Sequence, residues 1–251
     1  MSHLISSGNR RPLPAGKAPL RLGVPGFAHP LVAPVEWGRL CRAGLPLEWA
    51  VLGGASGGPG SRPDPYYAAA AAPLRNVGVR VLGHLDAGYG SRPFGELLSD
   101  AQRFLNWYKV DGFALARCPA DSGALADVRR VTGALRTLCE RAFLVLAHGS
   151  HPVPGYAALA DQLVTFTGPW NRYRWSRPAD WTADHAPGRF CHLVHSVPRD
   201  HLREALWIAR RQGAGTVYMT DRTDRDGLDP WESMPGYWDE FISNIGPGVS
   251  E

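Results

Sequence analysis

The sequence predicts an α/β protein built as a single (β/α)8 barrel, the TIM-barrel fold. Eight short apolar segments alternate with helical segments along the chain. These apolar segments are continuous rather than alternating, which is typical of parallel strands that are covered on both faces. The chain has 251 residues, which suits one closed barrel. An open doubly wound sheet is the alternative, although no GxGxxG motif follows the first strand and no Walker A motif occurs.

The predicted strands are rich in aliphatic and aromatic residues and are bounded by Gly, Pro or polar residues. In chain order they are Leu20–Phe27, Leu47–Gly53, Val79–Leu85, Gly112–Ala116, Phe143–Ala147, Leu163–Thr167, Cys191–His195 and Thr216–Thr220. Several of the connections that follow them are long and rich in Gly, Pro and Trp. In a barrel these connections gather on one rim, which is where a site is expected.

The segments between the strands are predicted helices. Phe94–Tyr108 is the clearest, because its apolar residues recur at helical spacing. Ser122 is the predicted N-cap of Ser122–Cys139. Gly213 is a predicted stop for Arg199–Arg211. The other predicted helices are Glu36–Ala43, Tyr66–Asn76, Gly155–Ala160 and Glu232–Ile242.

The stretch Trp107–Cys118 organises this interpretation. It predicts a helix end, a one-residue turn and a buried strand that ends at Ala116 and Arg117. Residues at the carboxyl end of a barrel strand face the ligand site. Here that position carries an arginine and no carboxylate.

Bulk properties limit the function classes. We expect a flexible tail over residues 1–17, a barrel over 18–245 and a short tail over 246–251. No apolar run is long enough for a signal peptide or a membrane span, so we expect a cytoplasmic protein that contacts no membrane.

The net charge is +4, and almost all of the positive charges come from arginine, which suits either an anionic ligand or a compositional bias. No Lys/Arg run has the length of a nucleic-acid tail, so nucleic acid is an unlikely partner. The four cysteines form no CxxC pair and predict reduced thiols without zinc.

Two carboxylates are predicted on the rim. Asp86 ends the third strand and is either a general acid or base, a hydroxyl acceptor, or a turn cap that pairs with Arg92. Asp221 ends the eighth strand and has the same alternatives. A glycosidase requires two carboxyl groups about 5–9.5 Å apart, and the third and eighth strands are not neighbours.

The other rim candidates are polar or aromatic. The candidate ligand-binding residues are Tyr89, Arg92, Arg117, His148, Thr167, Trp170 and His195. His148, His151 and His195 lack the fixed spacing of a metal site, so we expect no metal and no cofactor. The aromatic and basic segment Pro169–Trp181 suits either stacking on a ring or a lid, and the loop Gly54–Pro65 suits either an anion site or a plain multi-turn loop.

Several segments together resemble the spherulation-specific family 4, or spherulin-like, proteins. Ser56–Gly60 is similar to that family's sGPG loop, and Gly83–Gly90 is similar to its GYVxTxYG pattern. Trp107–Phe113 resembles its WYxxDGIFFDE stretch, and Asp229–Trp238 resembles its NPWxxLPxYW ending. The resemblance covers Leu22 to Phe241 and implies a (β/α)8 barrel related to glycoside hydrolases of galactosamine-containing polymers, in which rim acids carry the chemistry.

This sequence departs from the family pattern at those acids. The Asp-Glu pair of the family falls on Ala116 and Arg117, its further Glu falls on Thr167, and its Asn-Pro falls on Gly53–Gly54. Cleavage of a glycoside requires a proton donor and a nearby negative charge, and these side chains supply neither at neutral pH. Arg117 instead favours a carboxylate, phosphate or sulfate.

Three hypotheses follow from these departures. The first is a degenerate barrel, a pseudo-glycosidase that binds a carbohydrate-like or anionic small molecule without hydrolysis. The second is an active glycosidase or biosynthetic enzyme with a relocated site, in which Asp86 and Asp221 are the acid and base. The third is a protein-interaction module that binds a protein partner through Pro169–Trp181.

Overall fold

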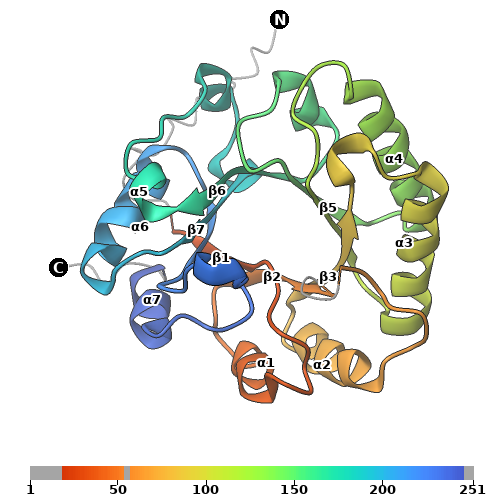
Figure 1. The fold of residues 1–251 in the computed structure, drawn as a ribbon, viewed down its shortest axis with the longest axis horizontal. Helices are drawn as coiled ribbons and strands as arrows, with labels where there is room; N and C mark the ends of the chain where they lie inside the picture. The colour runs from red at the N-terminus through yellow and green to blue at the C-terminus, as the bar shows by residue number, and fades with distance from the viewer. Residues whose placement is uncertain (1–18, 54–56, 246–251) are drawn as a thin grey trace, which may run out of the picture.

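The computed structural model describes residues 19–53 and 57–245, and it is a closed parallel barrel of eight strands in the order β1-β2-β3-β4-β5-β6-β7-β8. The strand β1 pairs with both β2 and β8, which closes the ring and excludes the open sheet. Figure 1 shows the ring of strands at the centre with the helices around it. The predicted (β/α)8 fold is therefore confirmed.

The strands run from the amino-terminal to the carboxyl-terminal end of the barrel in parallel. They are β1 (Arg21–Val24), β2 (Leu47–Leu52), β3 (Arg80–Asp86), β4 (Gly112–Ala116), β5 (Phe143–Ala147), β6 (Gln162–Pro169), β7 (Phe190–His195) and β8 (Thr216–Met219). The α-helices are α1 (Pro34–Leu40), α2 (Pro65–Asn76), α3 (Phe94–Tyr108), α4 (Leu125–Leu138), α5 (Trp170–Tyr173), α6 (Leu202–Arg211) and α7 (Trp238–Ile245). Short 3-10 turns connect them: η1 (Gly88–Gly90), η2 (Pro154–Ala158), η3 (Asp180–Asp184), η4 (Pro187–Arg189), η5 (Arg199–His201) and η6 (Arg225–Gly227).

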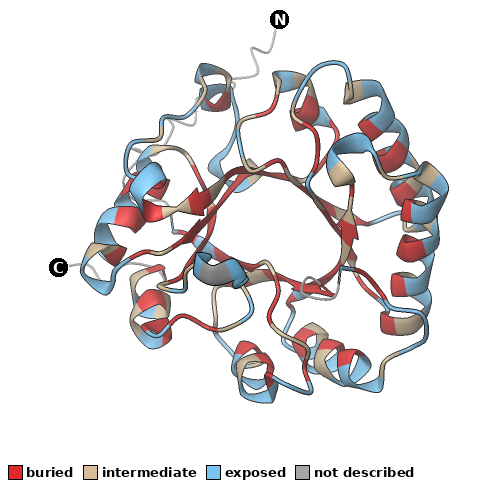
Figure 2. Cartoon of the chain, viewed as in Figure 1, coloured by how far each residue is buried: buried red, intermediate tan, exposed pale blue. Residues whose placement is uncertain are grey.

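The hydrophobic core lies between the strands and the inner faces of the helices, as the burial colours of Figure 2 show. Helix α3 illustrates the packing, because Leu97, Ala101 and Phe104 lie on its buried face. Phe104 lies so close to β3 that a Cβ on Gly83 would stand 2.6 Å from its ring. The helix ends at Lys109, which takes the left-handed conformation, and three residues, 109–111, connect it to β4 instead of the predicted one-residue turn.

Several predicted element boundaries were wrong, each for a local reason. Ser122 is no N-cap: the Asp121 carboxylate accepts the N–H groups of Gly123 and Ala124, and α4 begins only at Leu125. The predicted helix over 232–242 begins at Trp238, because Pro235 precedes it and a proline is strongly disfavoured in a helix interior. The segments expected as helix at 155–160 and at the start of 199–211 are the 3-10 turns η2 and η5. No helix among residues 19–53 and 57–245 has the length and apolar character needed to cross a membrane.

Candidate functional site

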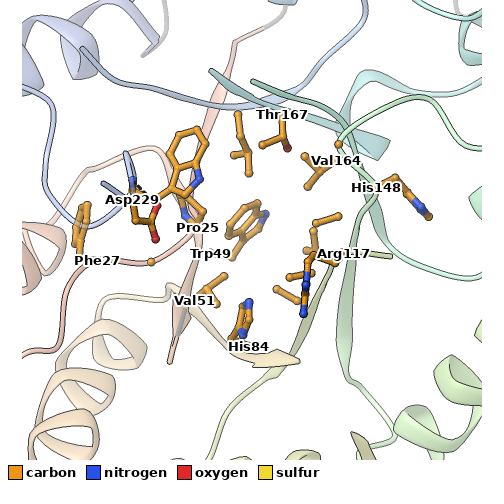
Figure 3. A pocket seen from close by; sticks show the side chains of 18 of the residues that line it. Pro25, Phe27, Trp49, Val51, His84, Arg117, His148, Val164, Thr167 and Asp229 are labelled. Atoms are coloured by element: carbon orange, nitrogen blue, oxygen red, sulfur yellow. Dashed lines mark hydrogen bonds between the residues drawn. The ribbon is translucent and has the colours of Figure 1, made fainter. Parts of the chain in front are cut away.

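A cavity of about 480 Å³ opens at the carboxyl ends of the strands. Figure 3 shows side chains from opposite strands converging on it. Its lining combines mid-strand apolar residues with polar residues that follow the strand ends. The lining residues are Pro25, Gly26, Phe27, Trp49, Val51, His84, Tyr89, Ala114, Ala116, Arg117, Val145, Ala147, His148, Gly149, Ser150, Val164, Thr167, Leu193, Asp229, Trp231 and Glu232.

The inner half of this cavity is apolar, and we name it the chamber. Its residues are Trp49, Val51, Ala114, Val145, Val164 and Leu193, all from the middle of strands. The interior of a (β/α)8 barrel is normally filled by large branched side chains. On the neighbouring strands β4 and β5, the inward positions Ala114, Ala116 and Ala147 carry only methyl groups. The small size of these side chains leaves the space open.

The indole of Trp49 closes the chamber from below. Its Nε1 donates to Gln162 Oε1 at 2.8 Å, which joins β2 to β6 across the interior of the ring. Gln162 Nε2 in turn donates to Glu48 Oε2 and to Thr216 Oγ1, both at 3.0 Å. These bonds fix the amide of Gln162 in one orientation and leave its oxygen facing the indole. The floor is therefore held in place by a buried polar network.

The floor also depends on a glycine of β1. A Cβ on Gly23 would stand 2.3 Å from Cζ2 of Trp49, well inside van der Waals contact. Only a residue without a side chain therefore lets the indole lie across β1.

An ion pair stands on the rim where β3 and β4 end. Arg117 donates from Nε to Asp86 Oδ1 at 2.7 Å and from Nη2 to Asp86 Oδ2, so the pair is bidentate. The Arg117 guanidinium holds the pKa of the Asp86 carboxyl below its usual range. Asp86 also accepts the N–H of Gly88 at 2.9 Å, so it caps the following turn. Asp86 is thus an ionised, fully engaged carboxylate rather than a proton donor.

Tyr89 completes this corner of the rim. Its N–H donates to the carbonyl of Arg117 at 2.7 Å, and the Arg117 guanidinium carbon lies 5.8 Å from the centre of its ring. Both residues have positive φ, 54° for Tyr89 and 49° for Arg117. Residues other than glycine rarely adopt this backbone conformation, and strained positions of this kind cluster at binding and catalytic sites.

Two histidines of the lining lack a full set of hydrogen bonds. Nδ1 of His84 and Nε2 of His148 are buried atoms with no hydrogen-bond partner among the described residues. The ring of His148 points away from the cavity (Figure 3): Nδ1 lies 2.8 Å from the carbonyl oxygen of Pro119, and the ring centre lies 4.8 Å from that of Tyr156. Burial lowers the pKa of both side chains, to about 4 for His148. Both are therefore neutral at pH 7.

The carboxylates that line the cavity come from the loop before α7. Asp229 and Glu232 stand on one turn, in which the N–H of Glu232 donates to the carbonyl of Asp229 at 3.3 Å. Trp231 lies between them, with its ring 5.7 Å from that of His195. Asp229 and Glu232 are both exposed at the mouth. Since Arg117 is paired with Asp86, these two acids leave the lining with an excess of negative charge.

The structure separates the predicted site residues into two groups. Tyr89, Arg117, His148 and Thr167 line the cavity, and Asp86 is joined to it through Arg117. Thr167 reaches the cavity because the register of β6 shifts between Val164 and Phe166, so that inward positions three residues apart both face the interior.

The second group lies elsewhere. Arg92 pairs with Asp100 beside α3, and Asp221 accepts the N–H of Gly236 at 2.9 Å in an adjoining hollow that Asp229 and Glu232 also line. Trp170 is buried and stacks on His201 at 5.4 Å. His195 is buried behind Trp231. His151 lies outside this lining, and no group of three metal-binding side chains occurs within the described parts of the chain.

Among the lining residues that sequence reasoning missed are Trp49, His84, Asp229, Trp231 and Glu232. The segment Asp229–Trp238 was recognised as a motif, and its position after the eighth strand was the signal that could have placed it on the rim. For Trp49 and His84 the alternation along their strands held the signal, but both strands were interpreted as continuously apolar. Part of the predicted anion-binding loop, residues 54–56, lies outside the described residues.

Comparison with known proteins agrees with this architecture. The sequence model of the spherulation-specific family 4 matches residues 21–245. Spherulin-4 of Physarum polycephalum is 24% identical over 213 residues, covering 81% of this chain and 64% of that protein. This chain thus spans less than two thirds of the length of that curated relative.

Solved structures show the same fold. Aspergillus clavatus Sph3, crystallised in complex with GalNAc, is 23% identical with a TM-score of 0.76, and the match covers 91% of this chain and 98% of Sph3. A glycosyl hydrolase family 2 member from Bacteroides cellulosilyticus is 15% identical with a TM-score of 0.50, over 81% of this chain and 28% of that one.

Proposed function

Since this chain belongs to the spherulation-specific family 4, we propose that it is a carbohydrate-binding barrel that holds a neutral sugar at its mouth and does not hydrolyse it. The solved relative Sph3 was crystallised with GalNAc, which supports a sugar as the ligand class. The aromatic residues Tyr89 and Trp231 on the rim suit stacking against the apolar face of a sugar ring.

The pairing of Arg117 with Asp86 is the observation that carries the proposal. By the resemblance, the acids of the family fall on Ala116, Arg117 and Thr167. Arg117 not only stands at one of these positions but also neutralises the nearest remaining carboxylate. A carboxyl group that is already ionised and bonded in this way has no proton to give to a leaving oxygen.

The same pair favours a neutral ligand over an anionic one. The guanidinium edge formed by Nε and Nη2 is occupied by Asp86, and the ion pair offsets the positive charge that would attract an anion. Asp229 and Glu232 add negative charge to the lining. A neutral sugar meets neither obstacle, and the uncharged imidazole of His84, which lines the cavity, suits a hydroxyl or amide group.

Calorimetric titration with N-acetylgalactosamine, together with a hydrolysis assay on its oligomers, tests the proposal. We expect saturable binding and no released sugar. Trp231→Ala should weaken binding about tenfold, whereas Trp175→Ala, which removes a tryptophan that is 77% exposed and outside the cavity lining, should leave binding unchanged. Hydrolysis that survives purification, or the absence of any binding, would refute the proposal.

An active hydrolase remains a second candidate because Asp229 and Glu232 are carboxylates that line the cavity. They replace Asp86 and Asp221 as the pair to test, since Asp86 is engaged by Arg117 and Asp221 does not line the cavity. Asp229→Asn and Glu232→Gln should each abolish any turnover under this alternative. Both carboxylates come from one turn, however, whereas glycosidase carboxyls flank the scissile bond.

A protein partner at Pro169–Trp181 has support from one exposed aromatic side chain of this segment. Trp175 projects into solvent, whereas Trp170 and Tyr173 are buried. We expect Trp175→Ala, and not a change at Trp170, to weaken any complex formed by this face.

A further inference from the structure

We propose that the chamber beneath the sugar site binds an apolar substituent of the ligand, so that the natural ligand is a glycoside carrying a short aliphatic or single-ring aglycone rather than a sugar polymer. This inference rests on the proposed function for the sugar portion only. It assigns a second subsite, formed by Trp49, Val51, Ala114, Val145, Val164 and Leu193, to a group of a different chemical class.

The first argument is the continuity of the chamber with the mouth. Ala114 and Ala116 lie two residues apart on β4, so both point inward, and Arg117 follows at the rim. The same step leads from Val145 through Ala147 to His148 on β5. A ligand seated against Arg117 and His148 therefore has the open space of the chamber below it along both strands.

The second argument is the scarcity of polar partners in the chamber. The six side chains that define it are apolar, the single polar atom of Trp49, its Nε1, already donates to Gln162, and the neighbouring His84, opposite Ala114 in the β3–β4 register, offers a single imidazole. Burying a hydroxyl without a hydrogen bond costs about 1–3 kcal/mol on the scale of protein mutations. A second sugar ring would bring several hydroxyls into this space, whereas an alkyl or aryl group brings none.

The third argument is the closed floor. Trp49 is 1% exposed and is held by Gln162 on one side and by the absence of a side chain at Gly23 on the other. A polymer cannot pass through the barrel beyond it. The subsite thus has a fixed depth, which selects for the length of the apolar group.

The test is a series of N-acetylgalactosamine glycosides with methyl, propyl, hexyl and phenyl aglycones, titrated by calorimetry against the intact protein. Each buried methylene should raise affinity about fourfold, from the transfer free energy of about 0.8 kcal/mol, until the chamber is full. The heat-capacity change of binding should become more negative along the series, as expected for apolar burial.

Ala114→Leu should fill the chamber and cancel this gain, while the methyl glycoside binds as before. Ala69→Leu, at an exposed position of α2, is the matched control and should keep the full series. Ala116→Val provides a smaller change in the same space if the leucine variant does not fold.

The possible results distinguish the inference about the chamber from the proposed function. If the methyl glycoside binds and longer aglycones bind no better, the chamber inference is overturned while the proposed function stands. If no glycoside binds but hexanol binds the wild-type protein and not Ala114→Leu, the chamber is supported and the proposed function fails. If neither glycosides nor hexanol bind, both are overturned.

Discussion

Replacing Gly23 with alanine should destabilise the barrel through a single clash. The new Cβ would stand 2.3, 2.6 and 2.7 Å from Cζ2, Cε2 and Cη2 of Trp49. Non-bonded carbon atoms do not approach one another this closely, so the indole or the strand would have to move. The indole cannot simply rotate away, because its Nε1 is bonded to Gln162 inside the ring. Overpacking of a core costs about 1–3 kcal/mol, and the lost hydrogen bond adds about 1 kcal/mol. We therefore expect a loss of about 2–4 kcal/mol in the free energy of unfolding.

Urea denaturation followed by tryptophan fluorescence measures this loss. Gly38→Ala is the matched control, because a Cβ there meets nothing within 4 Å and the residue lies in α1, where alanine should stabilise the helix by about 0.5–1 kcal/mol. Combining Gly23→Ala with Trp49→Phe, a smaller ring, should recover part of the loss. Equal stability of Gly23→Ala and the wild-type protein would show that the indole does not lie across β1 as described.

Two further predictions concern the left-handed backbone at Lys109 and the buried side chain of His148. Lys109→Gly should stabilise the protein by up to about 1 kcal/mol, because Lys109 has φ 53°, and Arg103→Gly inside the same helix should destabilise it by about as much in the same denaturation assay. His148 has a folded-state pKa of about 4, below its ordinary value of about 6.5, so the unfolded chain binds more protons between these values. The neutral side chain therefore contributes fully to the free energy of unfolding above about pH 6.5, and this contribution is lost as the pH falls toward 4. The loss amounts to about 3 kcal/mol. His148→Gln should flatten the pH dependence of the free energy of unfolding by that amount. A pH profile identical in His148→Gln and the wild type would contradict the neutral buried state.

The repeated alternation of apolar strands and amphipathic helices was sufficient to predict the barrel, because each unit carries its own local signal. The elements α3, β4 and β5 were predicted with their observed bounds. The site was harder, because its composition depends on which strand residues point inward. His84 and Trp49 sit inside strands that look uniformly apolar, and the shift in β6 that brings Thr167 to the cavity leaves no mark in the sequence.

Contacts between distant segments explain the other differences. The pairing of Asp86 was assigned to Arg92, its near neighbour in sequence, as one alternative. In the structure Arg92 turns to Asp100, and Asp86 bonds instead to Arg117 across the β3–β4 register, where Asp86 is opposite Ala116. Trp170 was placed on the rim by its position after β6, but burial against His201 and Tyr173 removes it from the cavity.

That register also bears on the replacement of rim acids that the resemblance implies. Residue 117 stands beside Asp86, so an acid at position 117, as the resemblance implies for the family, would place two negative charges next to each other and raise the pKa of one of them. Such a pair suits proton donation but opposes folding through repulsion. Arginine at this position replaces repulsion with a bidentate ion pair. The backbone around it is held by bonds that do not involve side chains, from Ala87 N–H to Ala116 and from Cys118 N–H to Ala147, at 2.9 and 3.0 Å. The strand end at position 117 can therefore carry either an acid or an arginine paired with Asp86, while the ring beneath it stays the same.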